Sequence, residues 1–141
     1  MDFQKINNLP DRVSTDLLEI IFKELINNFQ NNNIEKKDFF SILIELTDRQ
    51  VMTYEILEQN IKNEIDHILC QLWNTDSYED VDIILSIVIN LGLGCCFKKI
   101  KQSAIEKKAE MDKLILAEIL EMIDEAGDHI DNPYYELENK K

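Results

Sequence analysis

The scarcity of turn-forming residues constrains the fold most strongly, because only three glycines and two prolines interrupt 141 residues. A β-sandwich or barrel needs turn residues at roughly every tenth position. Long stretches of the chain instead carry apolar residues at steps of three and four, the period of an amphipathic helix. The sequence therefore predicts an all-α, single-domain bundle of five to seven helices, whose helix pairs would also suit a short solenoid.

Length and composition are those of one folded domain, since 45% of the residues are apolar and 30% are charged. We expect a single helical domain over residues 1–141, with flexible ends at 1–12 and 128–141. The N-terminal segment has no apolar run typical of a secretion signal, and the apolar stretch 83–93 is too short to span a membrane. We therefore expect a cytoplasmic protein with no membrane partner. Frequent Asn and Ile beside rare Ala favour a bacterial origin.

Apolar periodicity and helix-breaking residues predict where each helix lies, within a few residues. The predicted helices cover about 16–29, 35–46, 47–73, 78–91, 95–104 and 106–126.

Capping residues set the predicted boundaries of these helices. The predicted N-terminal caps are Asp16 with Glu19, Thr47 or Asp48, and Ser77 with Asp80. Glycine favours the left-handed geometry of a helix C-terminus, so Gly92 with Gly94 and then Gly127 are expected to end two helices. The helix over 78–91 is apolar nearly all round, which places Ile84, Leu85 and Val88 near the centre of the core.

No pattern in the chain is typical of catalysis. The glycine-rich nucleotide-binding motifs and the G-x-S-x-G nucleophile motif are both absent. His67 and Cys70 lie three residues apart on a predicted helix, but a zinc site needs about four ligands and no second pair is suitably spaced. Asp128 beside His129 is more typical of a solvated loop than of an acid–base pair. We therefore predict no enzyme activity, no catalytic residue, no metal and no cofactor.

The three cysteines, Cys70, Cys95 and Cys96, are too few for a disulfide framework, which fits a reducing compartment. Free cysteine is usually buried. We therefore expect all three to be structural thiols, with Cys95 and Cys96 packed under the Gly-Leu-Gly turn before them.

Acidic residues are concentrated in two stretches of a chain whose net charge is −13. No Lys or Arg occurs over 63–97 or over 114–139. The first stretch predicts an acidic surface made of Glu64, Asp66, Asp76, Glu79, Asp80 and Asp82. Between the stretches, lysines 98, 99, 101, 107 and 108 form a basic patch that is too small to imply direct nucleic-acid binding.

The second stretch places Glu118, Glu121 and Glu125 on one helix face, because they step by three and four. The same pattern expects Leu116, Ile119, Leu120 and Ile123 to pack on the opposite side. Such a face is either a solvated surface that keeps the chain soluble or a binding surface for a basic partner, and these readings carry equal weight. The candidate partner-binding residues are Asp76, Glu79, Asp80, Asp82, Glu118, Glu121, Asp124, Glu125, Asp128, Tyr134 and Tyr135.

Two segments, WNTDSYEDVDIILSIVINLGL and GDHIDNPYYEL, carry a resemblance that covers residues 63–138. There the chain resembles the small acidic helical immunity proteins encoded beside bacterial contact-dependent growth-inhibition toxins and other polymorphic toxins. The resemblance implies that the chain binds a cognate toxin domain, often a basic nuclease, and blocks its active site. The resemblance does not identify any individual residue of this chain as part of a binding site.

Two alternatives to an immunity protein remain. One is a regulatory or nucleic-acid-mimicking inhibitor, which offers carboxylates in place of phosphates to a host nucleic-acid-binding protein. The other is an enzyme or metal protein built around His67, Cys70 and carboxylates. Stoichiometric zinc or iron in purified protein would distinguish this last alternative from both inhibitors.

Overall fold

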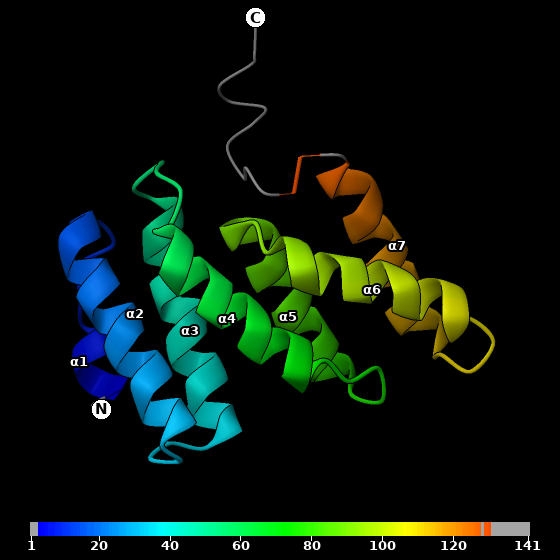
Figure 1. Ribbon diagram of the computed structural model, residues 1–141, viewed down its shortest axis with the longest axis horizontal. Helices are drawn as coiled ribbons and strands as arrows, with labels where there is room; N and C mark the ends of the chain where they lie inside the picture. Colours follow the sequence, from blue (N-terminus) through cyan, green and yellow to red (C-terminus); the bar gives the residue numbers. More distant parts are fainter. Residues whose placement is uncertain (1–2, 128, 131–141) are drawn as a thin grey trace, which may run out of the picture. The chain divides into compact units, whose positions relative to one another are not determined.

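The computed structural model of the chain describes residues 3–127, 129 and 130. This part contains seven helices and no strand, which confirms the predicted all-α class (Figure 1). The helices are α1 (Phe3–Asn7), α2 (Thr15–Gln30), α3 (Lys36–Val51), α4 (Gln59–Leu72), α5 (Tyr78–Leu91), α6 (Gly94–Glu106) and α7 (Lys113–Ala126). Within the same range, no helix combines the length and apolar character that crossing a membrane requires.

The chain divides into two compact units, Met1–Glu64 and Ile65–Lys141. Helices α1 to α3 belong to the first unit and α5 to α7 to the second, while α4 runs through the boundary. The single domain expected over 1–141 stays a prediction. Of the two ends expected to be flexible, 1–12 contains helix α1, whereas nearly all of 128–141 lies outside the described residues.

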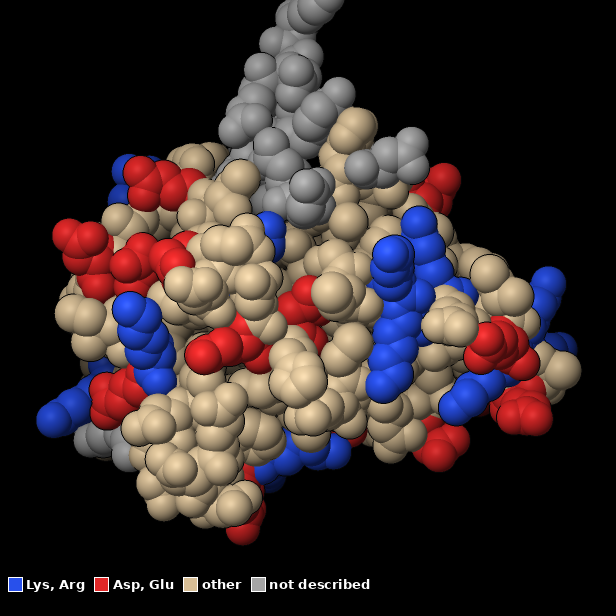
Figure 2. Space-filling view, viewed as in Figure 1, with Lys and Arg blue, Asp and Glu red and all other residues tan. Residues whose placement is uncertain are grey.

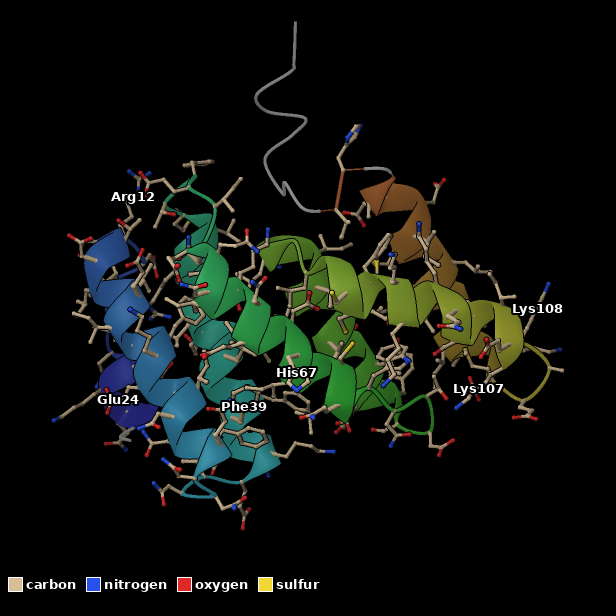
Figure 3. All side chains as sticks on the ribbon, viewed as in Figure 1. Arg12, Glu24, Phe39, His67, Lys107 and Lys108 are labelled. Carbon is tan, nitrogen blue, oxygen red and sulfur yellow. The ribbon has the colours of Figure 1, made fainter. Side chains whose placement is uncertain are left out.

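The first unit is built around the pair formed by α2 and α3, which lie side by side (Figure 1). Leu18 and Phe22 of α2 and Leu43 of α3 are fully buried. Phe29 stacks on Phe39, which Figure 3 labels, with 4.2 Å between ring centroids. The apolar periodicity therefore predicted both helices, although α3 continues to Val51, past the predicted end at residue 46. The cap of α2 is Ser14, whose hydroxyl accepts from the Leu17 N–H, and not the predicted Asp16, which lies inside the first turn.

Helix α1 packs against α3, and Arg49 of α3 binds the backbone of the N-terminal segment. Its side chain is 6% exposed and forms an ion pair with Glu45 at 2.8 Å. The same guanidinium donates to the backbone carbonyls of Leu9 at 2.8 Å, Pro10 at 3.2 Å and Asn7 at 3.4 Å. One buried cation thereby satisfies several carbonyls of a segment that has few apolar residues of its own.

The long helix predicted over 47–73 is wrong, because residues 52–58 separate α3 from α4. Thr47 is buried inside α3 instead of capping a helix. The Gln50 side chain donates to the Glu55 carbonyl at 2.9 Å, and Tyr54 takes a left-handed φ of 55°. Glu58 then accepts from the Ile61 N–H at 2.9 Å. These local hydrogen bonds end one helix and start the next, although apolar residues keep their three- and four-residue spacing through this segment.

Helix α5 lies at the core of the second unit, as predicted. Ile84, Leu85 and Val88 are buried. The Ser77 hydroxyl accepts from the Asp80 N–H at the start of α5, and Gly92 ends the helix with a φ of 72°. Both boundaries confirm the caps expected from the sequence, although Gly94 starts α6 and does not take part in ending α5.

Asp66 caps α6 and is not part of an acidic surface, which corrects the sequence prediction. Its side chain is 7% exposed. Its two carboxylate oxygens accept from the Cys96 N–H at 2.7 Å and the Cys95 N–H at 2.9 Å. A carboxylate at a helix N-terminus satisfies amides that have no partner within the helix and interacts favourably with the helix dipole. The buried charge therefore has a structural role.

The last predicted helix, over 106–126, is also corrected. Glu106 ends α6, and α7 begins only at Lys113, where the Asp112 carboxylate accepts from the Leu114 N–H at 2.8 Å. The buried residues of α7 are Ile115, Ile119 and Met122, whereas Leu120 is 50% exposed. Gly127 ends α7 as expected, with a φ of 56°.

Candidate partner-binding groove

A groove of about 300 Å³ runs between α5 and α7, which pack against each other within the second unit. Acidic side chains line it from both helices. Its lining consists of Asp82, Leu85, Ser86, Ile89, Asn90, Glu118, Glu121, Met122 and Glu125. The structure thus joins one residue of the first acidic stretch to three of the second, so these residues face a single groove.

The groove combines an apolar floor with charged and polar walls. Leu85 and Met122 are buried, whereas Ser86 of α5 and Glu121 and Glu125 of α7 are exposed. None of the described residues that line it is a Lys or Arg. Nothing in this lining therefore neutralises the carboxylates, and a cationic side chain with a long aliphatic stem would match both the floor and the walls.

Tyr78 and Asp82 contact Glu118 across the two helices. The Tyr78 hydroxyl donates a hydrogen bond to the Glu118 carboxylate, and the negative charge of Glu118 also acts on the Asp82 carboxyl group. Tyr78 and Asp82 are four residues apart and so share one face of α5. Tyr78 is 46% exposed, so one side of its ring remains open to solvent beside the groove.

Desolvation and like charge both raise the pKa of Asp82 above its ordinary value of 3.8. Burial is the largest cause, followed by the charge of Glu118 and the hydrogen bond to it. The hydrogen bond to Glu118 is the largest cause of the raised pKa of Tyr78. The two carboxyl groups of Asp82 and Glu118 therefore repel each other when both are ionised, and a cationic side chain would relieve this repulsion.

None of the other candidate residues that the structure describes lines the groove. Asp76 is exposed in the turn between α4 and α5, Glu79 is exposed in the first turn of α5, and Asp80 is half-buried there. Asp124 is exposed on α7 but does not line the groove. Asp128, Tyr134 and Tyr135 lie outside the described residues.

The cysteines and His67 occupy different environments in the second unit. Cys96 is buried and Cys70 half-buried, and desolvation is the main cause of the raised pKa of each thiol. A thiol with a raised pKa is a poor nucleophile at neutral pH. Cys95 is exposed, so its predicted packing is wrong, and His67 is exposed as well. In the part of the chain that the structure describes, no group of three or more His, Cys, Asp or Glu residues is arranged to hold a metal ion.

Basic side chains gather over α6 on the face shown in Figure 2. Lys98, Lys99 and Lys101 belong to this helix, and Lys107 and Lys108 follow in the connection to α7. Lys101 lies over the ring of Phe97, with 4.6 Å from its Nζ to the ring centroid. The described lysines of the second unit thus lie on α6, in the connection to α7 and at the first residue of α7, and none of them lines the groove.

No protein-family profile, curated protein or solved structure matches this chain. The sequence predicted only part of the groove. Helical spacing predicted that Glu118, Glu121 and Glu125 share a face. The contact of Asp82 with Glu118 depends on how α5 packs on α7, which no local pattern specifies.

Proposed function

We propose that the protein acts by binding, and not by catalysis, and that the groove between α5 and α7 receives a basic segment of a partner protein. The observation that carries this proposal is the lining itself, in which four carboxylates surround an apolar floor without a Lys or Arg. Following the resemblance to immunity proteins, the partner is a cognate toxin domain with a basic surface. Its neutralisation takes place in the bacterial cytoplasm.

Charge and shape in the groove support a lysine- or arginine-bearing partner. Long basic side chains place their methylene groups on apolar surface and their charge at a polar edge. Here the half-buried Ile89 provides the accessible apolar surface, and Glu121 and Glu125 provide the edge. Unneutralised acidic charge also raises the rate at which a basic partner is encountered.

The test is binding to the protein encoded by the neighbouring gene, together with capture of partners from cells that carry the chain's own genome. We expect one basic toxin domain to form a stable complex, and expression of the chain to protect cells from that toxin. Capture of a host DNA- or RNA-binding protein that nucleic acid displaces would contradict the toxin assignment and support the nucleic-acid mimic. A purified complex in which the toxin remained fully active would contradict neutralisation.

A further inference from the structure

We propose that a second pocket, within the unit Ile65–Lys141, binds a small zwitterion with an apolar body, which is the chemistry of a free apolar amino acid. The turn between α4 and α5 forms one side of this pocket, and α6 with the connection to α7 forms the other. The lining residues are Trp73, Asn74, Thr75, Asp76, Lys99, Ser103, Lys107, Glu110 and Met111. Its volume of about 420 Å³ falls in the range of small-molecule sites.

Hydrogen bonds hold the floor of the pocket in place. The Trp73 indole N–H donates to the Ser103 hydroxyl at 2.9 Å, and that hydroxyl donates to the Lys99 carbonyl at 3.0 Å. On the opposite side, the Asn74 side chain accepts from the Asp76 N–H at 2.9 Å and fixes the turn. Since the indole N–H is already bonded, Trp73 offers a ligand its apolar ring. A site fixed before binding loses less entropy when a ligand enters.

The rim of the pocket carries charges of both signs. The Lys99 ammonium donates to the Cys70 carbonyl at 2.6 Å and keeps two further N–H groups, because an ammonium has three donors. In the described part of the chain, neither Lys99 nor Lys107 forms an ion pair. Asp76 and Glu110 are exposed at the same rim. The lysines therefore suit a carboxylate, and the two acids suit an ammonium group.

This distribution of charge selects among ligand classes. A nucleotide or other polyphosphate would meet Asp76, Glu110 and a chain of net charge −13. A zwitterionic head group gains from both signs at the rim. Its apolar side chain then lies against Trp73 and the buried Met111. The pocket lies apart from the groove between α5 and α7, so the inference does not depend on the proposed function.

The experiment uses Trp73, the single tryptophan of the chain, as a reporter inside the pocket. The full chain is titrated with leucine, phenylalanine or methionine while Trp73 fluorescence is recorded. The chemical shift of its indole N–H provides a second measurement. N-acetylmethionine, which lacks the ammonium, and methionine amide, which lacks the carboxylate, are titrated in the same way. We expect methionine to bind and both derivatives to bind at least about threefold more weakly, as for the loss of one exposed charge pair.

Lys107→Gln and Lys108→Gln form a matched pair, because the two lysines are adjacent but only Lys107 lines the pocket. Figure 3 labels both on the connection between α6 and α7, with Lys108 at its outer edge. We expect Lys107→Gln to weaken methionine binding about threefold and Lys108→Gln to leave it unchanged. Thermal unfolding confirms that both variants are folded. The proposal is overturned if no apolar amino acid at millimolar concentration changes either signal, or if either derivative binds as well as methionine.

Discussion

Asp66 shows how one buried charge decides the start of a helix. Its carboxylate accepts two N–H groups of α6, from Cys95 and Cys96. Replacing it with Ala removes both hydrogen bonds and leaves those amides without a partner. We expect Asp66→Ala to lower the free energy of unfolding by about 1–3 kcal/mol. Urea denaturation measures the loss, and Glu64→Gln, on the same helix but exposed, serves as the control. Equal stability of the two variants would contradict the capping role.

Asp82 makes stability depend on pH in a defined direction. Its pKa is raised above 3.8 in the folded chain, so the folded state holds the proton more tightly than the unfolded state does. The contribution of Asp82 to the free energy of unfolding is therefore fully present below pH 3.8. It is lost as the pH rises through the pKa of Asp82 in the folded chain, which is higher.

We expect Asp82→Asn to be more stable than the parent at pH 7, by less than about 1 kcal/mol because solvent screens this exposed position. The advantage should shrink as the pH is lowered toward 3.8. Urea denaturation of both proteins at several pH values measures it. A parent more stable than Asp82→Asn at pH 7 would show that Asp82 has a favourable partner in the folded chain.

Among the elements, α5 could be predicted from the sequence and the break between α3 and α4 could not. Helix α5 has a strong apolar run between Ser77 and Gly92. Each of its ends depends on one residue, because the Ser77 side chain caps the start and Gly92 takes the left-handed conformation at the end. Residues 52–58 retain apolar residues at helical spacing, while Gln50 and Glu58 end and start the helices through side-chain hydrogen bonds. Such bonds compete with a helical pattern that hydrophobic spacing alone favours.

Helix α1 depends on α3 through Arg49, whose guanidinium binds the carbonyls of Asn7, Leu9 and Pro10. We expect Arg49→Met to keep most of the packing volume but lose these bonds, which costs about 2 kcal/mol. In this variant the amides of α1 should exchange with solvent faster than in the parent, and the increase should be larger than for the amides of α2. Hydrogen exchange followed by mass spectrometry measures this difference. Unchanged exchange over 3–9 would show that apolar packing alone holds α1.

For the whole molecule, net charge predicts solubility and partner class, but it does not locate a site. The structure places Asp66 in a buried cap and Asp82 in the groove, although both come from the same basic-free stretch. The central claim is that the groove binds a basic protein. Association through such a site should slow steeply as salt rises, because the screening length shrinks from about 10 Å at 0.1 M to about 3 Å at 1 M.

The most direct measurement is the affinity for the captured partner of two triple variants that lose the same charge. One changes Glu118, Glu121 and Glu125 to Gln in the groove, and the other changes the exposed Glu24, Glu55 and Glu64 to Gln outside it. Calorimetry at low salt should show the groove variant binding tenfold or more weakly, about 1.4 kcal/mol, and the control within about twofold of the parent. Equal affinities of both variants and the parent would contradict binding through the groove.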